Sequence, residues 1–160
     1  MITQMPKAVC SLIFNDQGMV LACSRKDDFT NFGLPGGKVD EEDLNLEIAA
    51  ARELKEETGL IVLEGQGIPV YTAMCYGKDD KHYLTTTYLW KSVIGTPKQI
   101  EGEGKVAWVS TDVICQTNGS SFSKYNKDLF DMMNIYIPEP WAKLKHTSNF
   151  HYKSSRIEEV

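Results

Sequence analysis

The chain has 160 residues, of which 42% are hydrophobic and 24% are charged, and its formal net charge is −5. This length predicts a single domain with a substantial core. The acidic balance and the lack of a basic face argue against a nucleic-acid partner, and no apolar run approaches the roughly 18 residues that would predict a membrane span. The four cysteines form no Cys-x-x-Cys pair, so we expect buried thiols in a cytoplasmic protein.

The N-terminal segment predicts two strands. Residues 8–14 are almost continuously apolar, residues 15–18 have turn chemistry, and residues 19–24 are again mostly apolar, so we expect a β-hairpin. The charged segment that follows predicts a loop. Arg25 lies at the end of the second strand, where it is either solvated or placed to meet a phosphate.

A glycine loop and a helix follow. Pro35 precedes two glycines, which exclude a helix there and allow the backbone to approach a ligand closely. The stretch from Leu46 to Glu57 consists almost entirely of strong helix formers. Asn45 is placed to cap the start of this helix, and Gly59 to end it in the left-handed conformation.

Three glutamates of this helix converge near the face that should meet the core. Glu53 and Glu57 fall in the same arc as Leu54, and Glu56 lies at its edge. Buried acids near a helix C-terminus repel one another and oppose the helix dipole. A divalent cation would reverse these penalties, since Mg²⁺ is held by carboxylates and substrate phosphates. The alternative is a solvated acidic face with Glu56 paired to Arg52.

The stretch from Gly37 to Leu60 resembles the Nudix box, the signature of hydrolases that act on nucleoside diphosphates linked to another group. Residues 52–60, Arg-Glu-Leu-Lys-Glu-Glu-Thr-Gly-Leu, fit the second half of the box at every defining position. The first half differs, because its loop is one residue longer. Asp43 (or Glu42) therefore stands in for the early glutamate that pairs with the arginine in the family.

The resemblance implies an α+β fold, an α/β/α sandwich with a mixed β-sheet between helices. It implies hydrolysis of a pyrophosphate bond with Mg²⁺ as the cofactor, for which Mn²⁺ can substitute. The metal ligands that it implies are Glu53, Glu56, Glu57 and the carbonyl of Gly37. Arg52 is expected to position the glutamates rather than to touch the substrate.

The acidic loop 95–104 precedes a short strand predicted at 105–110. In the family, a carboxylate from the loop before such a strand often completes the metal site or acts as a base. Glu101 and Glu103 are the candidates here, and the alternative is that both are solvated in a mobile loop. The group that orients or deprotonates the attacking water is therefore Glu53, Glu101 or Glu103.

The remaining pattern predicts strands and two further helices. The expected strands are 61–63, 68–76 and 83–91, with a hairpin tip at 78–81, and the expected helices are 111–114 and 124–136. We divide the chain into a Nudix hydrolase domain, 1–140, and a polar C-terminal extension of the same domain, 141–160. His146 and His151 lack metal-ligand spacing, so we expect them on the surface.

Several nucleotide classes fit this sequence. The compact size favours nucleoside triphosphates, including oxidised ones, over ADP-ribose, dinucleoside polyphosphates or FAD. Arg25 is a candidate phosphate contact, and Phe32, Tyr88, Phe29 and Tyr76 are candidates for stacking on a ring, with packing in the core as their alternative. The chain could also be a non-catalytic module that binds a nucleotide without cleaving it. We expect a monomer or a homodimer.

Overall fold

The computed structural model describes residues 4–77, 79–116, 121–135 and 155–160. In these residues the chain forms two four-stranded sheets and three helices. In chain order the elements are β1 Lys7–Leu12, β2 Val20–Arg25, β3 Asp28–Gly33, β4 Gly36–Lys38, α1 Leu46–Thr58, β5 Ile68–Tyr76, β6 His82–Leu89, β7 Val106–Val109, α2 Thr111–Cys115, α3 Ser121–Met132 and β8 Ile157–Glu159.

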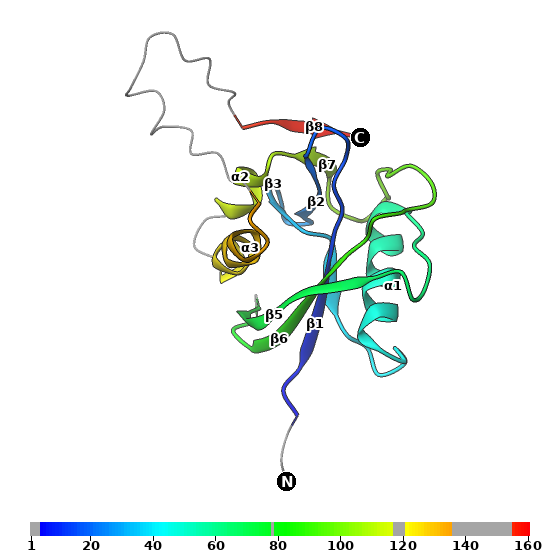
Figure 1. Cartoon of the computed structure of the whole chain (residues 1–160), viewed down its shortest axis with the longest axis vertical. Coiled ribbons are helices and arrows are strands. Elements are labelled where there is room, and N and C mark those ends of the chain that lie inside the picture. Colours follow the sequence, from blue (N-terminus) through cyan, green and yellow to red (C-terminus); the bar gives the residue numbers. More distant parts are fainter. Residues whose placement is uncertain (1–3, 78, 117–120, 136–154) are drawn as a thin grey trace.

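The two sheets differ in strand direction. The first has the order β4-β1-β6-β5 and is mixed, because β1 runs parallel to β6 while its other pairs are antiparallel. The second has the order β3-β2-β7-β8 and is antiparallel throughout. Figure 1 shows α1 on one side of the strands and α2 and α3 on the other. This confirms the expected α+β sandwich, with its strands divided between two sheets.

Two apolar clusters fill the space between these layers. One lies under α1 and includes Val9, Leu54 and Trp90. The other joins the second sheet to α2 and α3 and includes Phe32 and Phe130. Burying an apolar side chain of this size contributes about 1.5–3 kcal/mol, so the two clusters fix α1 and α3 on opposite sides of the strands.

Helix α1 confirms the expected boundaries to within a residue. The Asn45 side chain accepts a hydrogen bond from the Ile48 N–H at 2.8 Å, which caps the first turn. Gly59 ends the helix with φ +77°, and its N–H donates to the Lys55 carbonyl. Two alanines on the buried face, Ala49 and Ala50, let the helix backbone approach the sheet closely.

The hairpin expected at the N-terminus forms only next to its turn, and the predicted pairing of the two strands is wrong. An antiparallel bridge joins Phe14 to Val20, and the Leu21 N–H donates to the Ile13 carbonyl at 3.0 Å. Beyond this bridge β1 enters the first sheet and β2 the second. The apolar run predicts a buried strand correctly, but the partner of a strand depends on contacts far away in the sequence, here with β6.

Other differences concern strands at the margins of the sheets. The expected charged loop is a turn at residues 26–27, and the segment after it, for which no strand was expected, is β3 at a sheet edge, where its polar side chains can face solvent. The glycine loop itself forms β4 against β1. Residues 61–63 make only an isolated bridge between Ile61 and Ile94, with Val62 buried under α1 and Ile61 and Leu63 exposed.

The later elements follow the expectation closely. Strand β5 has the expected bounds, and β6, β7, α2 and α3 lie within a few residues of theirs. Part of the predicted extension 141–160 adds β8 to the second sheet beside β7. His146, His151, Tyr136 and Lys78 lie outside the described residues. In the described part of the chain, no helix is long and apolar enough to cross a membrane.

Candidate active site

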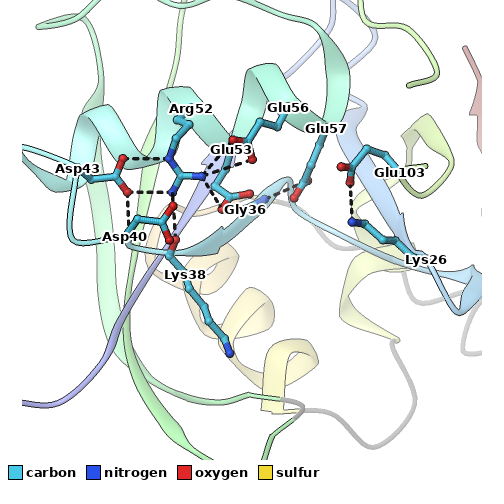
Figure 2. Close-up of polar contacts among 10 residues, drawn as sticks. All are labelled: Lys26, Gly36, Lys38, Asp40, Asp43, Arg52, Glu53, Glu56, Glu57 and Glu103. Carbon is cyan, nitrogen blue, oxygen red and sulfur yellow. Dashed lines mark hydrogen bonds and ion pairs between the residues drawn. The ribbon is translucent and has the colours of Figure 1, made fainter. Parts of the chain in front are cut away.

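Arg52 is the centre of a charged network that ties α1 to the loop before it (Figure 2). Its Nε–H and one terminal amino group donate to the two carboxylate oxygens of Asp43 at 2.9 and 2.8 Å. The Asp43 side chain is only 4% exposed, and the Arg52 guanidinium lowers its pKa. The same amino group also reaches the Lys38 carbonyl at 3.2 Å. Asp43, rather than the exposed Glu42, is therefore the partner of Arg52.

The other terminal amino group of Arg52 contacts two of the three glutamates. It donates to Glu53 Oε1 at 3.1 Å and to Glu56 Oε1 at 3.3 Å. The Glu56 side chain is 52% exposed, whereas that of Glu53 is 15% exposed. Arg52 thus holds both carboxylates on the side of α1 that faces the glycine loop.

Glu57 lies deeper and has no such cation. Its carboxylate accepts a hydrogen bond from the Gly36 N–H at 3.3 Å. Burial, and then the negative charge of Glu53, raise the pKa of Glu57 to about 8, and burial also raises the pKa of Glu53. Among the described residues, no lysine or arginine forms an ion pair with Glu57. The site therefore holds one more buried carboxyl group than its own cations pair with, and burial disfavours the ionised form of that group, Glu57.

The glycine pair sets the distance between the loop and these acids. A Cβ atom on Gly37 would lie 2.5 Å from the carboxylate carbon of Glu53, so only glycine permits the observed approach. A Cβ atom on Gly36 would lie 2.2 Å from the Val9 carbonyl oxygen in β1. Gly36 is therefore needed by the sheet, and Gly37 by the contact with Glu53.

The donor set fits a divalent cation such as Mg²⁺. Carboxylate oxygens are the ligands that this ion prefers, and the ion would balance the charge of Glu57, which no lysine or arginine pairs with in the described part of the chain. In the described part of the chain, no three acidic, histidine or cysteine side chains stand close enough together to hold one ion as they are placed. Arg52 holds Glu56 beside Glu53 in this arrangement, so Glu56 is the side chain that would have to turn.

A cavity of about 500 Å³ opens beside Glu57. Its lining combines acids, cations and aromatic rings, among them Glu103, Arg25, Phe32 and Phe122. Cavities of this size, apolar with a few polar groups, typically bind small molecules. The structure thus brings Arg25 and Phe32, both predicted substrate contacts, to the same cavity as Glu57.

The structure separates the two loop glutamates. Glu103 lines the cavity, and its charge contributes to the raised pKa of Glu57. It also pairs with Lys26 at 3.4 Å, as Figure 2 shows. Glu101 is exposed in the turn before it and does not line this cavity. Of the two candidates, Glu103 is the one placed near the α1 glutamates.

Tyr88, an expected substrate contact, does not line this cavity. The side chain is buried in the cluster under α1, and its ring stacks on Trp90 with 6.2 Å between centroids. The alternation of strand β6 turns it toward the helix rather than toward the cavity. Phe29 and Tyr76 lie outside the cavity lining as well: Lys105 Nζ lies 5.5 Å from the ring centroid of Phe29, and Tyr76 packs on His82.

Sequence reasoning missed the contribution of α3 to the cavity. Phe122 and Asn126 both line it, one helical turn apart. Asn126 is 3% exposed, and its side-chain N–H donates to the Ile114 carbonyl at 3.3 Å. A polar residue on the buried face of an amphipathic helix was the available signal, because such a residue needs a partner.

A glycine loop, then a helix that carries an arginine and three glutamates and packs on one side of the strands, defines the class of proteins to which this one belongs. The NUDIX domain model matches residues 4–128. The chain therefore belongs to the Nudix family, whose hydrolases act on phosphoric anhydrides and generally use divalent metals.

Solved structures of the family have the same fold. The MutT protein of Methanosarcina mazei has a TM-score of 0.64 and 24% identity, over 84% of this chain and 98% of that one. A NUDIX hydrolase from Nitrosomonas europaea has a TM-score of 0.65 and 18% identity, over 92% and 100%. The NUDIX domain of Shewanella oneidensis NrtR, solved with ADP ribose, has a TM-score of 0.61 and 24% identity, over 83% and 88%. Among curated proteins, none matches this chain.

Proposed function

We propose that this chain is a metal-dependent pyrophosphohydrolase that cleaves a diphosphate bond of nucleoside triphosphates, oxidised ones included. The observation that carries the proposal is Glu57, a buried acid with no lysine or arginine paired to it in the described part of the chain, beside Glu53, which shares the Arg52 guanidinium with Asp43 and Glu56. Such an arrangement destabilises the free protein, and binding of a divalent cation with a polyphosphate would relieve it. We propose Mg²⁺ as the ion, with Mn²⁺ as a substitute, held by Glu53, Glu56, Glu57 and the carbonyl of Gly37.

The reaction is attack by water on one phosphorus of the anhydride. A bond forms between the water oxygen and that phosphorus, the bridging P–O bond breaks, and the leaving phosphate takes the electron pair. The water proton passes to a carboxylate. Glu103 is the better placed of the candidates, because it lines the cavity while Glu53 is held by Arg52. Mg²⁺, when bound, neutralises phosphate oxygens and lowers the pKa of a coordinated water.

The cavity supports a nucleotide as the substrate. Phe32 and Phe122 offer apolar ring surfaces, which suits a base. Arg25 lines the same cavity, and its guanidinium matches a phosphate in charge and geometry, although it is bonded to Asp27 at 3.0 Å in this structure. A cavity of about 500 Å³ holds one nucleoside with its phosphates more readily than a dinucleotide.

ADP-ribose is the second candidate substrate. A related domain of the same fold was solved with ADP ribose, and the same acids and aromatic rings would serve it. Dinucleoside polyphosphates, FAD and simple nucleotide binding without cleavage are further outcomes that the following experiment separates.

The test is phosphate and nucleotide release from a panel of nucleoside triphosphates, 8-oxo-dGTP, ADP-ribose, a dinucleoside tetraphosphate and FAD, with Mg²⁺ and then with EDTA. We expect Mg²⁺-dependent cleavage, fastest with a nucleoside triphosphate, and its loss in Glu57→Gln. Faster cleavage of ADP-ribose would select the second candidate. Binding of a panel nucleotide without release would contradict the enzymatic proposal.

The cellular location belongs to the same proposal. In the described part of the chain, which includes all four cysteines, no disulfide forms, and Cys10 and Cys75 are buried. Unpaired cysteines are typical of a reducing compartment, which supports the cytoplasm. A fluorescent fusion that localised outside the cytoplasm would contradict this.

A further inference from the structure

The segment that carries Glu103 is held by hydrogen bonds along both of its edges. On one edge lies Ser24 at the end of β2, whose N–H donates to the Lys105 carbonyl at 2.8 Å. The Ser24 hydroxyl accepts a bond from the Lys105 N–H at 2.7 Å. The backbones also approach closely, because a Cβ on Gly104 would lie 2.0 Å from the Ser24 carbonyl oxygen. This edge is thus an extension of the pairing between β2 and β7.

The other edge is held by a side chain. The Gln99 amide donates to the Gly104 carbonyl at 2.6 Å and accepts from the Val106 N–H at 3.0 Å. The two bonds go to the residues on either side of Lys105. One residue of a parallel strand bonds its neighbouring strand in the same pattern. At the start of β7, the Gln99 side chain therefore makes the hydrogen bonds that a neighbouring strand would make.

The turn that carries Glu103 lies between the contacts of Ser24 and those of Gln99. The Glu103 N–H donates to the Ile100 carbonyl at 3.1 Å, and Gly102 adopts φ +84°, which favours glycine. Gln99 stands immediately before the turn, and the residues that it binds stand immediately after it. The position of the Glu103 backbone is thus fixed from both ends.

We propose that Gln99 is a positioning residue for Glu103, holding its carboxylate at the cavity wall beside Glu57. This inference rests on the proposed function, in which Glu103 assists the attack of water. The Lys26–Glu103 pair contributes less, because the Lys26 side chain is 67% exposed and exposed pairs are weak. Gln99 lies at the surface, outside both apolar clusters, so its replacement leaves the core intact.

The experiment compares Gln99→Met, Glu103→Gln and the double variant with the wild type, using the nucleotide that the panel above identifies. Gln66→Met is the control, since Gln66 is also exposed and, within the described residues, its side chain makes no hydrogen bond. A displacement of about 1 Å can cost up to a hundredfold in rate. We expect Gln99→Met to lower kcat about tenfold, with KM changed by less than about twofold, and Gln66→Met to be unchanged.

The double variant separates positioning from a general structural effect. If Gln99 acts through Glu103, adding Gln99→Met to Glu103→Gln lowers kcat no further. If the double variant instead lowers kcat by the product of the two separate reductions, the inference is overturned. A second readout needs neither metal nor substrate: the Val106 amide of metal-free Gln99→Met should exchange its hydrogen about tenfold faster than in the wild type. Unchanged exchange would equally overturn it.

The activities of three variants distinguish failure of the inference from failure of the proposed function. Full activity in Glu57→Gln would remove the proposed function. An inactive Glu57→Gln and an impaired Glu103→Gln, together with a normal Gln99→Met, would leave the function standing and overturn the inference alone.

Discussion

The uncompensated charge of Glu57 predicts that metal-free Glu57→Gln is more stable than the wild type at alkaline pH. Glutamine keeps an oxygen that can accept from the Gly36 N–H, and it removes the carboxylate that burial and Glu53 disfavour. The substitution therefore isolates the cost of ionising this one side chain.

The direction and magnitude of this stability difference follow from the pKa of Glu57. The pKa of Glu57 is about 8 in the folded protein, against an ordinary value of 4.5, so between these values the folded state binds one proton more than the unfolded state. Stability must then fall as pH rises through this range. Each pKa unit corresponds to about 1.4 kcal/mol. Between pH 6 and pH 9 the wild type should lose about 2–3 kcal/mol relative to the variant.

The assay is urea unfolding followed by tryptophan fluorescence, with EDTA present, at pH 6 and pH 9. Adding Mg²⁺ at about a thousand times its Kd should reverse the ranking at pH 9, because it stabilises the folded wild type by about 4.1 kcal/mol and stabilises the variant little. Parallel pH profiles of the two proteins, or equal stabilisation by Mg²⁺, would refute the reasoning.

Three further predictions concern the same network. Asp43→Ala should lower the free energy of unfolding by about 2–3 kcal/mol, because it leaves Arg52 without its most buried partner; unchanged urea unfolding would contradict this. Glu103→Gln should lower kcat at least tenfold while Glu101→Gln leaves it unchanged, and the opposite ranking in steady-state assays would reassign the loop carboxylate. Gly37→Ala should displace Glu53 and abolish the rise in melting temperature caused by Mg²⁺, with the fold retained by circular dichroism; a normal rise would show that the close approach is dispensable.

Local signals predicted α1 and its acids well. The cap at Asn45, the stop at Gly59 and the helical spacing of the glutamates depend on residues close together in the sequence. The resemblance to the Nudix box also offered Asp43 or Glu42 as the partner of Arg52, and the structure selects Asp43. These features are set by short-range geometry, which a single sequence carries.

Long-range contacts could not be obtained in this way. The apolar run of β1 indicates that both faces of the strand are buried, but it does not identify β6 as the parallel partner of β1. Tyr88 was expected at the cavity because aromatic residues suit ring stacking, yet the direction of its side chain depends on which face of β6 meets α1. The choice between Glu101 and Glu103 required the fold of the loop, where Gln99 and Ser24 fix the backbone.

We propose that the three α1 glutamates, Glu53, Glu56 and Glu57, converge on one divalent cation. The most direct measurement is a crystal structure with Mn²⁺ and a non-hydrolysable nucleotide, with the ion located by its anomalous signal. We expect the ion between the carboxylates of Glu53, Glu56 and Glu57 and close to the Gly37 carbonyl, with Glu56 turned away from Arg52. An ion bound elsewhere, with Glu56 still on Arg52 and Glu57 free of metal, would contradict it.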